Sequence, residues 1–148
     1  MTEQSRTTPQ TAIRLEAVVK RYGAENAVDG IDLEIRRGEL VTLLGPSGCG
    51  KTTTLRLIAG LELPTAGRVC IAGSDVTGEP ASARNVGMVF QSYALFPHIS
   101  VLENVSYGPM IRGVSKRDAR ARAHELLNQI GLAGLHDRLP SELSGGQQ

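Results

Sequence analysis

Apolar residues follow different spacings in the first and second parts of the chain. Between residues 13 and 44 they form short runs that are rich in β-branched residues and in places alternate with polar ones, which is typical of strands. Between residues 100 and 131 they recur at intervals of three and four residues, the period of an amphipathic helix. The pattern predicts a β-rich first part and a helical second part, and therefore an α/β fold class.

Five segments have the length and composition of strands. In order along the chain they are 13–20, 28–35, 39–44, 68–72 and 85–90. The third runs directly into a glycine-rich segment, and the fifth ends at Gln91. We expect all five to be hydrogen-bonded strands.

Three helices are predicted from the residues at their ends. The first covers 52–59 and stops at a glycine, which is a common residue at the C-terminal end of a helix. The second opens at the capping box Ser100–Glu103 and extends toward Tyr107. The third runs from Ser115 to about Ile130. Its apolar positions fall at helical spacing and are assigned to packing: Ala119, Ala123, Leu126, Leu127 and Ile130.

The segment Gly45–Thr53 fits the pattern G-x-x-x-x-G-K-[ST] of a phosphate-binding loop. Its glycines let the main chain turn tightly against ligand oxygens. The Lys51 ammonium can reach the β- and γ-phosphates, and the Thr52 hydroxyl is placed to hold Mg²⁺. The alternative is a glycine-rich surface turn without a ligand. The candidate binding residues are Gly45, Pro46, Ser47, Gly48, Cys49, Gly50, Lys51, Thr52 and Thr53.

Composition narrows the class of protein further. The chain has 16 basic and 15 acidic residues, a net charge of +1, which gives no support for a nucleic-acid partner. Its two cysteines suggest neither a disulfide framework nor a metal site. No apolar run approaches the roughly 18 residues of a membrane span, and the N-terminus lacks the apolar region of a signal peptide. We expect a soluble protein in a reducing cytoplasm.

A second motif, Leu143–Gln147 with the sequence LSGGQ, lies after the predicted helices. With the phosphate loop before it, the chain resembles the ATP-binding subunits of ABC transporters from about Ile13 to Gln148, and LSGGQ matches that family's signature residue for residue. The resemblance implies a P-loop NTPase core, an N-terminal antiparallel β subdomain and a helical signature subdomain. It implies a disordered lead-in at 1–12 and a partial ATP-binding domain at 13–148. Within that domain, the β subdomain and P-loop core would cover about 13–90, and the switch-glutamine loop and helical subdomain about 91–148.

The resemblance also implies roles for individual residues. Tyr22 would stack on adenine, the alternative being an ordinary tyrosine at a strand end. Lys51 and Gln91 would be catalytic, with Gln91 contacting Mg²⁺ and the attacking water; the alternative for Gln91 is a solvated loop amide. The signature residues would act in trans, closing over the γ-phosphate held by a second subunit: Leu143, Ser144, Gly145, Gly146 and Gln147.

The region Gln91–His98 resembles importer subunits of the polyamine, ferric-iron, phosphonate and sugar type. Its apolar residues Tyr93, Leu95 and Phe96 would face a short helix of the permease; the alternative is a buried loop core. The implied cofactors are ATP and Mg²⁺. The implied partners are a second ATP-binding subunit in a homodimer, permease subunits and, indirectly, a solute-binding protein outside the cell, with the subunit held peripherally at the cytoplasmic face of the membrane.

The family pattern continues past the signature with a strand ending in Asp, an adjacent catalytic Glu and a later His, and none of these can be assigned here. Since these parts position water and stabilise the transition state in phosphoryl transfer, we expect a truncated subunit that binds ATP without hydrolysing it. Two alternatives are a non-hydrolysing nucleotide-binding module and an ABC-type ATPase acting on DNA or ribosomes. The second would need long helical insertions or tandem domains, and neither occurs in the sequence.

Overall fold

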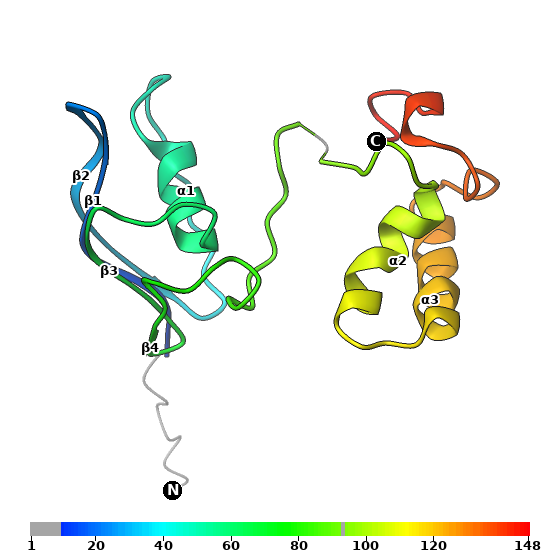
Figure 1. Ribbon diagram of the computed structural model, residues 1–148, viewed down its shortest axis with the longest axis horizontal. Coiled ribbons are helices and arrows are strands. Elements are labelled where there is room, and N and C mark those ends of the chain that lie inside the picture. The colour runs from blue at the N-terminus through cyan, green and yellow to red at the C-terminus, as the bar shows by residue number, and fades with distance from the viewer. Residues whose placement is uncertain (1–9, 93) are drawn as a thin grey trace, which may run out of the picture. The chain divides into compact units, whose positions relative to one another are not determined.

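The computed structural model describes residues 10–92 and 94–148, and the chain divides into two compact units (Figure 1). The β unit extends to Met88, and the helical unit runs from Val89 to Gln148. Nine of the twelve residues of the predicted lead-in, and Tyr93, lie outside the described residues.

An antiparallel sheet of four strands in the order β2-β1-β3-β4 forms the base of the β unit. The strands are β1 (Thr11–Tyr22), β2 (Glu25–Arg36), β3 (Ala66–Ile71) and β4 (Ser74–Asp75). Strands β1 and β2 form a hairpin, and β3 pairs with the other edge of β1, where Leu15 lies opposite Val69. The strands predicted over 13–20, 28–35 and 68–72 are confirmed.

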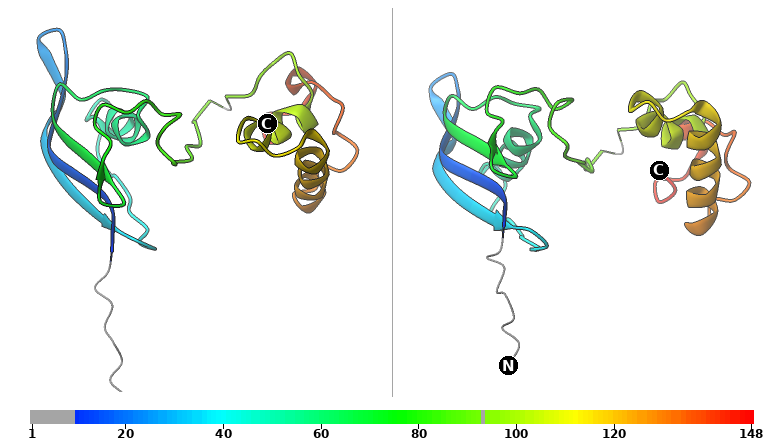
Figure 2. Two further views of the ribbon diagram at one scale, coloured as in Figure 1. Left: turned by 60° about the horizontal axis from the view of Figure 1, so that its bottom comes forward. Right: turned by 90° about the horizontal axis from the view of Figure 1, so that it is seen from below.

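Helix α1 (Lys51–Ala59) lies against one face of this sheet (Figure 2). Leu57 and Ile58 of α1 pack with buried residues of β1, β2 and β3. The helix ends at Gly60, whose φ of +74° is the left-handed conformation that glycine adopts without a Cβ clash. The prediction of a helix over 52–59 with a glycine at its end is confirmed, with one added residue at the start.

The strands predicted over 39–44 and 85–90 are not formed. Both segments are extended, but neither joins the sheet among the described residues. Their apolar side chains are open to solvent, with Leu40 95%, Leu44 99% and Val89 97% exposed. An apolar run is stable as a strand only when neighbouring strands form hydrogen bonds with its N–H and C=O groups and other elements cover its faces. No described segment does this for either run, so the prediction of strands over 39–44 and 85–90 was wrong.

A buried arginine joins the end of α1 to the loop after β4. Arg84 is 3% exposed, and its guanidinium donates to the backbone oxygens of Leu57 at 2.6 Å and Ile58 at 3.1 Å. It also donates to the backbone oxygens of Thr77 and Glu79. These bonds satisfy carbonyls that the last turn of a helix leaves unpaired, so Arg84 fixes the C-terminal end of the helix that follows the phosphate loop.

The helical unit contains α2 (Val101–Ile111), α3 (Lys116–Gln129) and the short 3₁₀ helix η1 (Pro140–Glu142). Helix α2 begins at the predicted capping box: the Glu103 N–H donates to Ser100 Oγ at 3.2 Å, and the Ser100 N–H donates to Glu103 Oε2 at 3.1 Å. It continues one turn beyond Tyr107 despite the Gly and Pro that follow. Packing against α3 offsets the low helix propensity of those two residues.

Helix α3 matches its predicted bounds, but only part of its apolar pattern is buried. Ala119, Ala123 and Leu127 are buried, whereas Leu126 and Ile130 are exposed. The three buried residues are spaced four apart and therefore share one face, which packs against α2 in a cluster with Val101, Leu102 and Leu143. The expectation that all five positions serve packing was wrong for Leu126 and Ile130. In the described part of the chain, no helix has both the length and the apolar character that crossing a membrane requires.

Candidate nucleotide-binding site

The phosphate loop joins the extended segment 39–44 to helix α1. Gly48 and Gly50 have φ values of +84° and +89°, in the left-handed region that a side chain makes strained. At Gly50 there is also no room, since a Cβ would lie 2.2 Å from the backbone oxygen of Ala27 in β2. Two of the loop's glycines are therefore required by its geometry.

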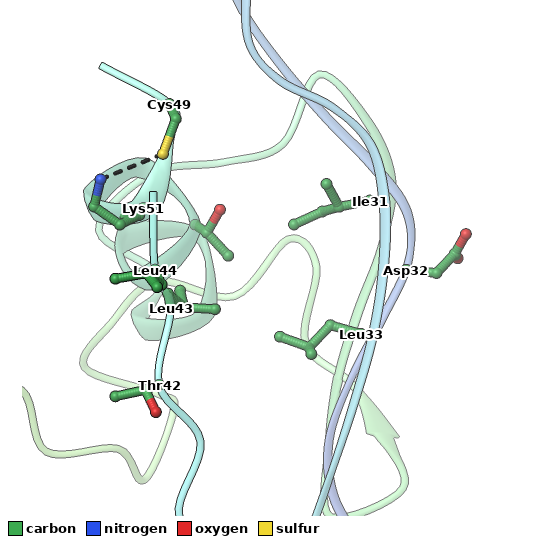
Figure 3. A pocket seen from close by; sticks show the side chains of 9 residues that line it. Ile31, Asp32, Leu33, Thr42, Leu43, Leu44, Cys49 and Lys51 are labelled. Carbon is green, nitrogen blue, oxygen red and sulfur yellow. Dashed lines mark hydrogen bonds between the residues drawn. The ribbon is translucent and has the colours of Figure 1, made fainter. Parts of the chain in front are cut away.

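Lys51 folds back over its own loop. Its ammonium donates to the backbone oxygens of Gly45 at 2.7 Å and Pro46 at 2.6 Å, and it contacts Cys49 Sγ at 3.3 Å (Figure 3). The ammonium therefore lies inside the loop, at the point where the pattern requires a positive charge. To bind a phosphate, it would exchange carbonyl oxygens for more strongly charged acceptors.

The start of α1 offers further donors. Its N-cap residue is Gly50, the described residues place no side-chain acceptor there, and its first turn has no acidic residue. The first N–H groups of α1 therefore point toward the loop with the positive end of the helix dipole behind them. The Thr54 hydroxyl is used within the helix, donating to the Gly50 oxygen at 3.0 Å, whereas Thr52 is exposed. Among these threonines, the exposed Thr52 hydroxyl is therefore the one open to a ligand.

A cavity of about 400 Å³ lies beside the loop, between β2 and the segment 42–44 (Figure 3). Ile31 and Leu33 point into it from β2, while Asp32 points away. Its apolar walls are Ile31, Leu33, Leu43 and Leu44, and Thr42, Thr54, Cys49 and Lys51 add polar groups. The cavity therefore lies beside the unpaired apolar segment, with the Lys51 side chain among its lining groups.

Tyr22 lies at the same end of the sheet as the phosphate loop. It is the last residue of β1 and pairs with Glu25 of β2, while Lys20 pairs with Val28. The backbone of Gly50 lies against Ala27 and Val28, so the loop abuts the final rungs of this hairpin. Tyr22 is 48% exposed, which leaves part of its ring free for contact with a planar ligand.

The remaining predicted residues belong to the helical unit. Gln91 is exposed. Phe96 is held against α2, because its N–H donates to Asn104 Oδ1 at 2.8 Å and its ring lies 4.7 Å from that of Tyr107. Phe96 is nevertheless exposed, unlike a buried loop core. The phosphate loop and Tyr22 thus occupy one unit, and Gln91 and the signature occupy the other.

The signature forms a turn with one buried and four exposed residues. Leu143 is buried in the core of the helical unit, and Ser144, Gly145, Gly146 and Gln147 are exposed. The N–H groups of Gln147 and Gln148 both donate to the Ser144 oxygen, at 2.9 and 3.1 Å. These three- and four-residue spacings are those of a first helical turn. Leu143 therefore anchors a short polar turn at the surface.

Three residues that support the site were not predicted from the sequence. Arg84 fixes the end of α1, and Lys20 and Glu62 form an ion pair of 3.0 Å beside Tyr22. Lys20 could have been found, because residues two apart in a strand share a face. Nothing in the sequence pairs Arg84 or Glu62 with its contacts, since these come from loops brought together by folding.

Comparison with known proteins places this arrangement in a family. The ABC transporter family model matches residues 28–148. The Fe(3+) ions import ATP-binding protein FbpC of Brucella abortus (strain 2308) is 58% identical over 137 residues, covering 93% of this chain and 39% of that protein. The protein of the same name from Pasteurella multocida (strain Pm70) is 53% identical over 134 residues, covering 90% and 38%. The chain thus spans about 39% of the length of such curated relatives.

Solved structures agree with the sequence comparison. A dimeric ATP-binding cassette in a post-hydrolysis state bound to ADP and Pi superposes with a TM-score of 0.80 at 33% identity, covering 91% of this chain and 64% of that one. A nucleotide-free ATP-binding cassette from an ABC transporter gives 0.75 at 28% identity, covering 93% and 60%. The expected fold class, an α/β ATP-binding domain with an antiparallel β subdomain and a helical part, is confirmed. The chain belongs to the ABC transporter family.

Proposed function

We propose that this chain is the ATP-binding part of a subunit that drives import of a solute through a membrane permease, by ATP-dependent closure of a dimer and ATP hydrolysis. The observation that carries the proposal is the phosphate loop: Gly50 seated against β2, the Lys51 ammonium inside the loop, and the open start of α1 behind it. These groups supply the positive charge and N–H donors that a triphosphate needs.

Mg²⁺ fits this site as a companion of the nucleotide. The described residues hold no cluster of three or more His, Cys, Asp or Glu that could bind a metal ion by itself. Mg²⁺ commonly takes only one or two protein ligands and completes its shell with phosphate oxygens and water. We assign one of those ligands to the Thr52 hydroxyl. The ion would neutralise phosphate charge, while Lys51 and the N–H groups of α1 orient the phosphates.

We propose that the signature acts on a second copy of the subunit. Ser144, Gly145 and Gly146 are exposed while Leu143 holds the turn to its core, so the turn can meet another molecule without unfolding. Its N–H groups and hydroxyl suit the γ-phosphate bound at the partner copy's phosphate loop. The related cassette bound to ADP and Pi is dimeric, which supports this arrangement.

The proposed permease contact is the segment Gln91–His98, of which Tyr93 lies outside the described residues. Phe96 and His98 line a cavity of about 360 Å³ with Tyr107 and Met110 of α2. An exposed apolar hollow of this size can take a side chain of a partner helix. This contact would hold the subunit at the cytoplasmic face of the membrane, with a solute-binding protein acting indirectly and no nucleic acid involved.

The proposed solute is ferric iron. Curated relatives at 53–59% identity carry the name Fe(3+) ions import ATP-binding protein, and the Gln91–His98 region resembles a group of importers that includes the ferric-iron type. Uptake of labelled Fe³⁺ by cells that lack the gene, with and without the gene restored, measures this directly. Uptake that is equal in both strains would contradict iron as the solute.

Titration of the chain with Mg-ATP in a calorimeter tests nucleotide binding. Lys51→Ala should weaken binding roughly 10- to 100-fold, because it removes a charged donor to phosphate. Lys116→Ala, which removes an exposed lysine from the start of α3, is the control and should bind as the parent chain does. Equal affinity in the parent and Lys51→Ala would refute the proposal. Phosphate release in the same samples tests the expectation that these 148 residues bind without hydrolysing.

A further inference from the structure

The side chain of Lys20 lies over the ring of Tyr22. The two residues are two apart in β1 and therefore project from the same face of the strand. The Lys20 ammonium is 4.9 Å from the centre of the Tyr22 ring, within the range of a cation–π contact. The candidate adenine-stacking residue thus already has a cation against one face of its ring.

Lys20 is itself held in place from the connection between α1 and β3. Its ammonium pairs with Glu62 Oε2 at 3.0 Å and donates to the backbone oxygen of Leu63 at 2.9 Å. The side chain of Lys20 is 15% exposed and that of Glu62 is 28% exposed, so both groups are partly screened from water. The long, flexible lysine chain is therefore fixed at its charged end, and the position of the cation over the ring is set by a different segment of the β unit.

Glu62 remains charged across the neutral range. Its pKa lies below the ordinary value, first because Lys20 donates a hydrogen bond to it, with a smaller lowering from the Tyr22 hydroxyl. The ion pair that anchors Lys20 is thus present whenever a nucleotide would bind. The three side chains form one unit, in which Glu62 holds Lys20 and Lys20 holds the ring.

A ring held in one orientation binds a flat ligand more tightly, because the rotational freedom it would lose on binding is already removed. Lys20 covers one face of Tyr22, while the side chain as a whole is 48% exposed. A base can therefore stack on the part of the ring that Lys20 does not cover.

We propose that Lys20 is a positioning residue of the adenine subsite, fixing the Tyr22 ring through a cation–π contact and anchored by Glu62. The inference rests on the proposed function, in which Tyr22 stacks on the base of ATP. It extends that function by assigning the base-dependent part of the affinity to three residues. Lys20 acts through the ring and makes no contact with the phosphates.

Comparing ATP with inorganic tripolyphosphate separates the base from the phosphates. Both would bind the phosphate loop, but only ATP carries adenosine. A variant that changes the ratio of their affinities therefore acts on the adenosine side of the site. Lys20→Met keeps the apolar stem and removes the charge. It should weaken ATP binding roughly three- to tenfold and leave tripolyphosphate binding unchanged. Tyr22→Ala should weaken ATP binding roughly 5- to 100-fold, again without affecting tripolyphosphate.

Two further variants test the route of the effect. Lys20→Met should have no additional effect in a Tyr22→Ala background, since there is then no ring to position. Lys20→Arg keeps a cation over the ring and should recover most of the ATP affinity, whereas Glu62→Gln should lower it less than Lys20→Met does. The chain has no tryptophan, so Tyr22→Trp supplies a single emitting indole. ATP should quench it and tripolyphosphate should not, with weaker quenching when Lys20→Met is added.

The failures are distinguishable. If Lys20→Met weakens both ligands equally, Lys20 serves only the fold, and the inference is overturned. If it strengthens ATP binding, the base uses the face that Lys20 covers, and the inference is again overturned. If Tyr22→Ala changes the affinity ratio and Lys20→Met does not, the inference alone fails. If the parent chain binds neither ligand, the proposed function is wrong, and the inference that rests on it is wrong as well.

Discussion

The two units of this chain differ in how far apart in the sequence their bonded residues are. In the helical unit, α2 and α3 each begin at a serine whose Oγ accepts an N–H three residues later, from Glu103 and Asp118. In the β unit, β1 pairs with β3 at positions such as Leu15 and Val69, which are far apart in the chain. Elements closed by nearby residues formed where the sequence placed them. Strands, which need partners far away in the sequence, formed only where a neighbouring strand is present to pair with them.

The same difference appears in the cores. The β unit buries Leu15, Val18, Leu57 and Val69 between a sheet and a helix, and the helical unit buries Leu102 and Leu127 between two helices. No buried residue is shared by the two clusters among those that the structure describes. Each unit therefore has its own source of hydrophobic stabilisation.

The largest expected effect comes from truncating a buried side chain in the core of the helical unit. Leu102→Ala should lower its free energy of unfolding by about 2–5 kcal/mol, because Leu102 is fully buried. Leu126→Ala, at an exposed position of α3, is the control and should change it by about 0.5 kcal/mol or less. Amide hydrogen exchange should show the loss of protection in α2 and α3. An equal loss in β1 and β2 would show that the two cores are one cooperative unit.

A smaller difference, about 1–3 kcal/mol between two glycine variants, is expected from a backbone clash in the β unit. Gly67 and Gly73 have nearly the same φ, +83° and +84°, but a Cβ at Gly67 would lie 2.3 Å from the Ala17 oxygen, while at Gly73 it would meet open space. Gly73→Ala should cost about 1–2 kcal/mol from the left-handed backbone alone. Gly67→Ala should cost about 1–3 kcal/mol more, since β1 and β3 must also separate. Urea unfolding of both variants measures the difference, and equal costs would contradict the clash.

The smallest effect tests a local bond. Ser100→Ala should destabilise α2 by about 1 kcal/mol, since it removes the hydroxyl that caps the Glu103 N–H. The pKa of Glu103 is lowered, first by its hydrogen bond from the Ser100 N–H. Its contribution is therefore fully present above the unfolded-state pKa and is lost as pH falls through the lower folded pKa.

That loss should appear as a drop in the free energy of unfolding of the parent chain at acidic pH, and Glu103→Gln should flatten it. Glu125→Gln, which removes an exposed partner of Arg122, is the matched control and should leave the acid-range slope as it is in the parent. A slope unchanged by Glu103→Gln would mean that the capping box contributes nothing to the pH dependence.

The sequence predicted the local geometry of the glycine loop and of α1 better than it predicted the strands beside them. Gly50 and Lys51 lie in the loop as the pattern requires, and α1 ends at the expected glycine. The apolar run before the loop was expected to be a strand and is not one. Alternation and hydrophobicity describe what a segment can bury, whereas a strand also needs neighbours that the segment itself does not contain.

The sequence by itself determined where the three helices begin, where α1 and α3 end, and the turn of the glycine loop before α1. These features rest on residues within a few positions of one another, where capping bonds, turn glycines and side-chain period act locally. Only the tertiary structure decided that Arg84 closes the end of α1, that Leu126 faces solvent, and that Glu62 holds Lys20 over Tyr22. These contacts join segments from different elements or loops, and their geometry exists only once the chain has folded.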